Sequence, residues 1–276
     1  MRVPSRRAVS AALRLVRWAN ALTAAAGVVV GAWWAGWGDT ARVAVAAIAA
    51  IGLTAAANAW NDLADVELDR FAHPGRPLVT GALSARAADR IAMVAATGAV
   101  LAASDVSVTL GLCSVGVLLL MRLYSPWIKR AGFAGNLLVS VLGSLPFVYG
   151  SYAAGHGTRG LPLMLIAIPF HFARELAKDL DDQDADRRAR RTLPVALGAP
   201  FARGAIIAAL IAGALALAFG LAPLVESPAL LFAALTPAMI ALALATARTL
   251  RGLPGSPAFF KLAMVCAMAA LVVARA

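Results

Sequence analysis

The sequence predicts an all-α protein, a polytopic bundle of about nine transmembrane helices that surround a polar pocket at their cytoplasmic end. Hydrophobic residues make up 61% of the 276 residues, and charged residues only 14%, whereas roughly a quarter of the residues of a soluble domain are charged. The apolar residues fall in blocks of about 17 to 25 residues, which is the length that crosses a bilayer. Acidic residues, in contrast, gather in two short clusters. These observations argue against an ordinary soluble domain.

Nine apolar blocks follow one another along the chain. Their approximate bounds are 14–36, 41–61, 86–104, 106–122, 133–153, 160–177, 203–223, 228–247 and 257–274. The first block is long and eight further blocks follow it, so we expect a membrane span there rather than a cleaved signal peptide. We expect one integral-membrane domain over residues 1–276.

The distribution of basic residues predicts how the chain is oriented. In the nine-span arrangement, Arg42, Arg159 and Arg275 lie on one side of the membrane, and the other 22 of the 25 Lys and Arg residues lie on the opposite side. The positive-inside rule assigns that second side, with the N-terminus, to the cytoplasmic face of the cell membrane. The membrane topology and an anionic substrate then account for the net charge of +11. We also expect anionic membrane lipids to be partners of the basic loops. We expect no nucleic-acid binding, because the basic residues are divided among separate loops.

Two acidic clusters share the spacing D-x-x-D-x-x-x-D, each at the end of an apolar block on the predicted cytoplasmic side. The aspartates are Asp62, Asp65 and Asp69 in the first cluster and Asp179, Asp182 and Asp186 in the second. At 100° per residue, the members of each triad lie within about 60° of one another on a helix. Two such faces repel unless cations lie between them, and oxygen ligands that leave room for water and phosphate suit Mg²⁺. The spacing therefore predicts a diphosphate site with two Mg²⁺ ions facing the cytoplasm.

Other polar residues near the clusters have simpler interpretations. Asp181 and Asp184 fall off the face of their triad, so we expect them to be solvated. Glu67 is likewise off the face of Asp62 and Asp69, and we expect it at the membrane interface. Glu175 lies on the triad face one turn before the second cluster, where a role in the site and an ion pair with a neighbouring base both remain open. His171, one further turn away, is either a packing residue or a contact for a substrate.

The chain also contains a weak internal repeat. An apolar block, an acidic cluster, a basic stretch and a second apolar block occur at about 41–104 and again at about 160–223. This order predicts two weakly similar halves with one polar pocket at their junction.

The residues around both clusters resemble the UbiA superfamily of intramembrane prenyltransferases. The stretch N-D-x-x-D-x-x-x-D-R…R-P-L-x-x-G over 61–81 is similar to its first signature, and the second aspartate triad is similar to its second. The stretch 124–136, with Tyr124, Lys129 and Asn136, resembles its central loop and the span that follows. Arg17-Trp-Ala-Asn20 resembles its first-helix motif.

This resemblance implies that the protein transfers an isoprenyl group from its diphosphate to a lipophilic acceptor, with Mg²⁺ bound by the six aspartates. Candidates for added positive charge on the diphosphate are Lys129, Arg76 and Lys178. Tyr124 is either an active-site residue or an anchor at the membrane interface. The candidates for substrate binding are Asn20, Asn58, Asn61, Arg76, Lys129 and Asn136.

Within the superfamily, the motif from Arg174 to Pro194 resembles that of the digeranylgeranylglyceryl phosphate synthase branch, which implies a geranylgeranyl donor and geranylgeranylglyceryl phosphate as acceptor. An aromatic acceptor, of quinone or tocopherol type, and a terpene cyclase that needs no acceptor both remain open. A transporter is disfavoured, because the polar residues gather at one end of the spans rather than near mid-bilayer.

Overall fold

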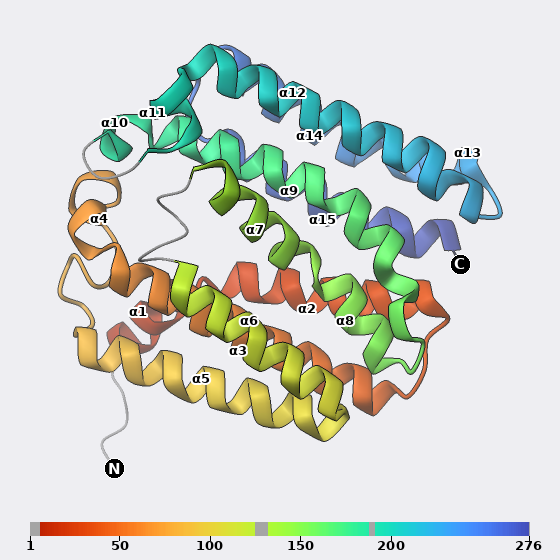
Figure 1. Ribbon diagram of the computed structural model, residues 1–276, viewed down its shortest axis with the longest axis horizontal. Helices are drawn as coiled ribbons and strands as arrows, with labels where there is room; N and C mark the ends of the chain where they lie inside the picture. The colour runs from red at the N-terminus through yellow and green to blue at the C-terminus, as the bar shows by residue number, and fades with distance from the viewer. Residues whose placement is uncertain (1–5, 125–131, 188–190, 276) are drawn as a thin grey trace.

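The computed structural model describes residues 6–124, 132–187 and 191–275, and in this part of the chain every regular element is a helix (Figure 1). In chain order the elements are α1 (Arg6–Val16), α2 (Trp18–Ala35), α3 (Thr40–Ala64), α4 (Val66–Ala72), α5 (Ala85–Val106), α6 (Val108–Tyr124), α7 (Phe133–Ser144), α8 (Pro146–Ala153), η2 (Gly157–Gly160), α9 (Leu161–Asp181), α10 (Gln183–Asp186), α11 (Leu193–Leu197), α12 (Ala199–Leu215), η3 (Ala216–Leu221), η4 (Ala222–Leu224), α13 (Pro228–Ala234), α14 (Thr236–Leu250) and α15 (Ser256–Arg275).

The predicted membrane bundle is confirmed in its class. In the described residues, six helical stretches are long and apolar enough to cross a membrane: Thr40–Ala64, Ala85–Val106, Phe133–Ala153, Gly157–Asp181, Ala199–Leu224 and Ser256–Arg275. Two bent pairs raise the number to eight if each is one span, namely α1 with α2, bent by 50°, and α13 with α14, bent by 51°. The predicted span 106–122 forms α6, which is apolar but has only 17 residues. The number nine therefore remains a prediction.

Small side chains allow the helices to pack closely. On α5 the residues Ala88, Ala92, Ala96, Ala99 and Ala103 are all buried, and their spacing of three or four residues forms one stripe. This helix packs along α3, which buries alanines of its own. In a bilayer, lipid tails are as apolar as leucine, so close van der Waals contact between small residues is what favours helix association.

The contact between α2 and α8 is closer still. A Cβ atom built on Gly150 would lie 1.9 Å from the carbonyl oxygen of Val28, and one built on Gly31 would lie 2.1 Å from the carbonyl oxygen of Phe147. Both obstacles are backbone atoms, which no side-chain rotation can move. Glycine is thus required at both positions for these two helices to approach one another.

The bundle has two chemically different ends. The short helices α4, α10 and α11 gather at one end, at the left of Figure 1, and the C-terminus lies at the other. Arg42 donates to the carbonyl of Val106 at 2.8 Å, and Arg159 donates to that of Ala35 at 3.4 Å, so both arginines bond the last turn of a helix. Arg275 stacks over the Trp34 ring at 5.0 Å. The three basic residues predicted to lie apart from the others thus contact helix ends, and the side of the membrane that each end faces remains a prediction.

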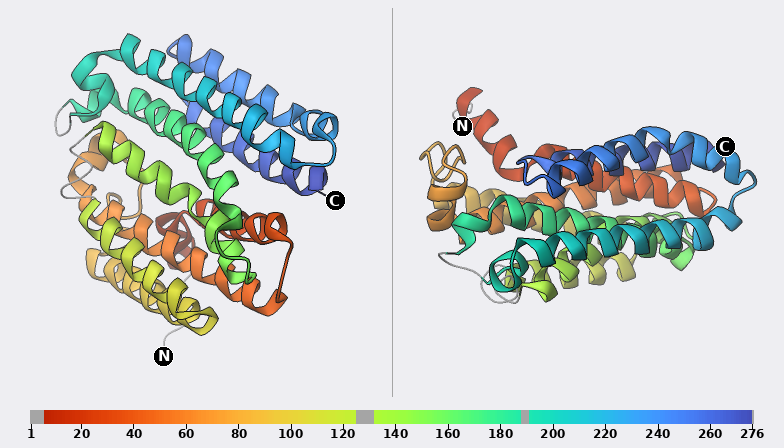
Figure 2. Two further views of the ribbon diagram at one scale, coloured as in Figure 1. Left: turned by 45° about the vertical axis from the view of Figure 1, so that its right-hand side comes forward. Right: turned by 90° about the horizontal axis from the view of Figure 1, so that it is seen from above.

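The two predicted halves contain the same order of elements. A long helix, a short acidic helix and a second long helix occur as α3, α4 and α5, and again as α9, α10 and α12, with α11 inserted before the last. The long helices run roughly along one direction in both views of Figure 2. That these halves are related and form one domain stays a prediction.

We expect Gly150→Ala to lower the stability of the folded protein by about 1–3 kcal/mol, because α2 and α8 must separate to admit the methyl group. Thermal unfolding of the purified protein in detergent measures this. Gly98→Ala is the matched control, since nothing lies within 4 Å of a Cβ there. Equal melting temperatures for the two variants would contradict the close packing of α2 on α8.

Candidate active site

Each aspartate triad spans a break between a long helix and a short one. Helix α3 ends at Ala64 and α4 begins at Val66, with Asp65 between them at φ −101° and ψ 6°. Likewise Asp182 separates α9 from α10 at φ −93° and ψ 3°. The expectation that each triad lies on one continuous helix is therefore wrong. Both interruptions lie in the sparsely populated bridge region of backbone angles, where active-site residues are often found.

Five of the six aspartates are buried despite these breaks. The exposed fraction is 2% for Asp62, 8% for Asp65, 4% for Asp69, 8% for Asp179 and 1% for Asp186. The side chain of Asp182 is 20% exposed. Asp181 and Asp184 are exposed, as their position off the face of their triad predicted, and Glu67 is exposed as well.

The structure brings the two acidic clusters together at one end of the bundle. Helix α4 packs against α10, and both lie at the left of Figure 1. The imidazole Nε2 of His73, which follows α4, lies 3.5 Å from Oδ1 of Asp182. Residues more than a hundred positions apart in the sequence thus face one another.

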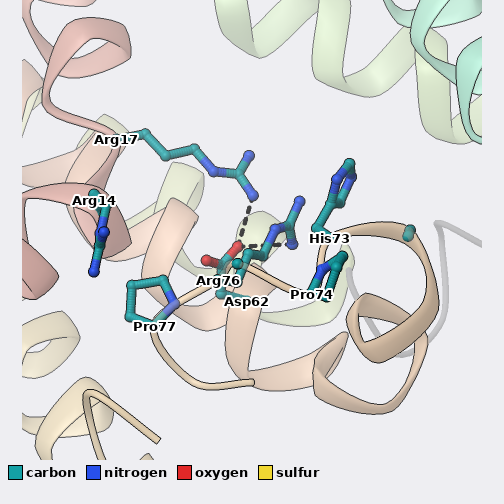
Figure 3. Close-up of a pocket in the computed structure, with 9 residues that line it drawn as sticks. Arg14, Arg17, Asp62, His73, Pro74, Arg76 and Pro77 are labelled. Atoms are coloured by element: carbon teal, nitrogen blue, oxygen red, sulfur yellow. Dashed lines mark hydrogen bonds and ion pairs between the residues drawn. The ribbon is translucent and has the colours of Figure 1, made fainter. Parts of the chain in front are cut away.

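Two arginines hold the buried carboxylate of Asp62. Arg17 Nη2 lies 2.6 Å from Asp62 Oδ1, and Arg76 Nη1 lies 3.1 Å from the same oxygen, as the dashed lines in Figure 3 show. Arg76 also pairs with Asp69. Arg17 has φ 50° and ψ 59° at the bend between α1 and α2. This left-handed conformation costs about 1–3 kcal/mol in a residue other than glycine and is typical of functional sites.

The surroundings shift the acidity of two aspartates. Burial raises the pKa of Asp69 above its usual value, and although Arg76 lowers it, burial prevails. Burial also acts to raise the pKa of Asp182, but His73 and the neighbouring cations outweigh it, so the pKa lies below the usual value. Nearby positive charge therefore favours the ionised form of Asp182.

An open pocket of about 450 Å³ lies beside these groups (Figure 3). It is lined by Arg14, Arg17, Asp62, Ala72, His73, Pro74, Gly75, Arg76 and Pro77. Three of the lining residues are arginines, which bind phosphate groups bidentately. The pocket is therefore suited to an anion with several oxygens.

On the other side of the site, α9 carries a set of paired polar groups. Asn136 of α7 donates to Asp179 Oδ2 at 2.7 Å in a buried contact. Glu175 accepts from Arg174 at 2.6 Å and from Lys178 at 2.8 Å. Of the two interpretations of Glu175, the ion pair is the one that the structure contains, and both Arg174 and Lys178 are its partners.

The remaining candidate residues differ in their placement. Asn20 accepts from Lys261 at 2.6 Å. Asn58 donates its amide to the carbonyl of Val16 at 3.0 Å, so its NH₂ group bonds the end of α1. Asn61 is half-buried beside Asp62. Lys129 and the side chain of Tyr124 lie outside the described residues.

The six aspartates do not converge into one ligand set. In residues 6–124, 132–187 and 191–275, no three Asp, Glu, His or Cys side chains lie close enough together to hold a metal ion. Asp62 and Asp69 are instead paired with arginines, Asp62 with Arg17 and Asp69 with Arg76. Mg²⁺ itself needs only one or two carboxylates when water and substrate phosphates supply its other ligands. The donor set of the site fits that mode of binding.

Sequence reasoning missed several residues that the structure places at the site. Arg14 and His73 line the pocket, and the sequence indicated Arg17 only as part of the first-helix motif. Lys261 was also missed, although a lysine inside a membrane span is a signal of function by itself.

Comparison with known proteins identifies the family. The model of the UbiA prenyltransferase family matches residues 20–271. The chain belongs to this family. It is therefore a prenyltransferase of the membrane, and the predicted resemblance is confirmed.

Curated relatives and solved structures agree with this assignment. The chain is 40% identical over 191 residues to the digeranylgeranylglyceryl phosphate synthase of Halobacterium salinarum, which covers 67% of this chain and 68% of the relative. It is 33% identical over 222 residues to the enzyme of the same name from Ignicoccus hospitalis, covering 78% and 73%. A UbiA homologue from Aeropyrum pernix K1 has the same fold, with a TM-score of 0.76 at 21% identity over 92% of this chain and 96% of that one.

We expect Asn136→Leu to destabilise the protein by about 1–3 kcal/mol, because the buried carboxylate of Asp179 would lose its hydrogen-bond donor. The melting temperature in detergent measures the loss. The control is a double-mutant cycle in which Asp179→Leu removes the hydrogen-bond acceptor. If Asn136→Leu costs as much in that background as in the native protein, the contact with Asp179 is not the cause.

Proposed function

We propose that this prenyltransferase is Mg²⁺-dependent and moves a geranylgeranyl group from its diphosphate to geranylgeranylglyceryl phosphate. One observation carries the proposal: two acidic clusters meet at one end of an apolar bundle, beside an arginine-lined pocket. Acidic groups could hold the metal ions of a diphosphate, and arginines could hold its oxygens. The relatives at 33–40% identity that bear the name digeranylgeranylglyceryl phosphate synthase support this choice of acceptor.

The expected metal ligands are drawn from both triads: Asp62, Asp65, Asp69, Asp179, Asp182 and Asp186. Two Mg²⁺ ions bound there would supply Lewis-acid stabilisation of the departing diphosphate. Structures of a UbiA homologue from Archaeoglobus fulgidus contain Mg²⁺ with GPP or DMAPP, and one of them has a TM-score of 0.70 to this chain at 17% identity, covering 95% and 99% of the two chains. This likeness supports magnesium as the cofactor.

The arginines of the pocket have a double role in the proposed mechanism. Arg17 and Arg76 pair with Asp62 in this structure, and the same guanidinium groups face the pocket. When a diphosphate binds, their remaining N–H groups would donate to its oxygens. Lys129 is a further cation expected there besides the three arginines, and Asn61 could donate its amide to the same oxygens.

The reaction then proceeds by loss of the diphosphate. The bond between C1 of the isoprenyl group and oxygen breaks, the electron pair leaves with pyrophosphate, and an allylic cation remains. The acceptor hydroxyl attacks C1, and its proton passes to the departing pyrophosphate. The apolar helices would hold the isoprenyl tail and keep water from the cation.

The site is proposed to face the cytoplasm, at the membrane of the cell. The support is the distribution of charge. The acidic and arginine-rich end carries α4, α10 and α11. Away from the pocket, Arg42 and Arg159 bond carbonyls at helix ends, and Arg275 stacks over the Trp34 ring. Positive charge accumulates on the cytoplasmic side of membrane proteins.

Substitution of the proposed metal ligands tests the site. We expect Asp62→Asn and Asp182→Asn to lower Mg²⁺-dependent turnover at least about a hundredfold, because charge on the leaving group would lose its stabilisation. Asp184→Asn and Asp181→Asn are the matched controls, since both carboxylates are exposed. Pyrophosphate release by purified protein measures the rates. Near-native turnover in either ligand variant would refute the assignment of that residue.

Acceptor identity is tested by offering geranylgeranyl diphosphate and Mg²⁺ with geranylgeranylglyceryl phosphate or, separately, with 4-hydroxybenzoate. We expect the doubly alkylated glycerol phosphate as product, and chelation of Mg²⁺ to stop its formation. Mass spectrometry of the lipid extract identifies the product. A prenylated aromatic acid would support prenyl transfer but contradict the proposed acceptor. A hydrocarbon or terpene alcohol would indicate a cyclase.

A further inference from the structure

A second group of charged side chains lies between α2, α9 and α15, and none of its members lines the pocket. On α9, Arg174 and Lys178 share the carboxylate of Glu175, at 2.6 and 2.8 Å. On α15, Lys261 donates to the amide oxygen of Asn20 at 2.6 Å. We call Arg174, Lys178, Glu175 and Lys261 the basic cluster. Three helices far apart in the sequence thus meet at charged groups inside a membrane bundle.

The charges of the basic cluster do not balance. Two of its three cations, Arg174 and Lys178, share the one carboxylate of Glu175, which leaves a formal excess of two positive charges in the cluster. Among the described residues, Lys261 has no carboxylate within 4 Å and bonds a neutral amide, and its helix α15 packs against α9, which carries Arg174. Arg174 Nε is buried and has no hydrogen-bond partner in the described part of the chain. The side chains of Arg174 and Lys178 remain 22% and 41% exposed, so an anionic ligand can reach this excess of positive charge, and the cluster is suited to one.

The basic cluster adjoins the diphosphate site through the helices that they share. Asn20 follows Arg17 by one helical turn on α2, and Arg17 pairs with Asp62. On α9, Lys178 immediately precedes Asp179, which bonds Asn136 of α7. An anion bound at the cluster would therefore lie near the diphosphate but contact different residues.

We propose that Arg174 and Lys261 bind the phosphate group of a lipid phosphomonoester acceptor. This inference rests on the proposed function and deepens it, since it separates the residues that hold the acceptor from those that hold the diphosphate. A phosphomonoester carries about 1.5 to 2 negative charges at pH 7, which matches the excess of the cluster. Arg174 offers the planar donor group that suits phosphate oxygens, and Lys261 offers a compact positive charge from the facing helix. With its phosphate held there, the acceptor's hydroxyl can face the diphosphate.

Kinetics with two acceptors test the proposal: geranylgeranylglyceryl phosphate and the same glycerol ether without its phosphate. We expect Lys261→Met to raise the KM for the phosphorylated acceptor about tenfold or more relative to the KM for the dephosphorylated one, with a much smaller change in the KM for geranylgeranyl diphosphate. Lys261→Arg should restore most of the difference. Arg251→Met, which removes an exposed arginine after α14, is the control and should leave both acceptor constants as they are.

Two results would overturn the proposal. One is an equal rise of KM for both acceptors in Lys261→Met, which would indicate a structural role. The other is a native protein that does not prefer the phosphorylated acceptor. Failure of the proposed function is a separate result, namely transfer to an aromatic acid and to neither glycerol ether. In that case we would measure direct binding of geranylgeranylglyceryl phosphate by thermophoresis. Equal affinity of the native protein and Lys261→Met would contradict the proposal, and weaker binding by the variant would support it.

Discussion

Burial of carboxylates at the end of an apolar bundle is the constraint on which the site depends. An ionised carboxylate removed from water costs several kcal/mol unless charged or polar partners compensate it. Asp62 is compensated by Arg17 from the bend after α1 and by Arg76 from the loop after α4. This one oxygen therefore ties together three separate segments of the chain. Arg17 has a left-handed conformation at the bend between α1 and α2, and its guanidinium contacts this carboxylate.

The same compensation makes the site suitable for anions. Arg17 and Arg76, which pair with Asp62, also line the pocket. Positive charge and carboxylate oxygens therefore lie side by side. Diphosphate chemistry needs both, since the carboxylates suit metal ions and the arginines suit phosphate oxygens. The basic cluster on α9 and α15 has a different balance, with more cations than carboxylates. We therefore infer two anion sites of different character within one bundle.

Hydropathy explains how much of the fold was predictable from the sequence. Long apolar blocks become helices in a membrane because every backbone group must be bonded within its own segment, so the bounds of the long helices were largely predictable. The breaks at Asp65 and Asp182 were not, because helical periodicity assumes an uninterrupted helix. The span predicted over 106–122 and helix α6 both have 17 residues, so hydropathy also predicted the length of α6, displaced by two positions.

The sequence by itself determined the class of the fold, the family and the two aspartate triads, because each of these is encoded in local spacing and composition. Only the tertiary structure decided which groups those aspartates meet. Asp182 faces His73, and Asp62 is shared by two arginines. Lys261 bonds Asn20 from 241 residues away. Such contacts depend on how the helices pack. In a membrane, packing depends on the shapes of side chains along whole helices, and a short sequence motif does not predict it.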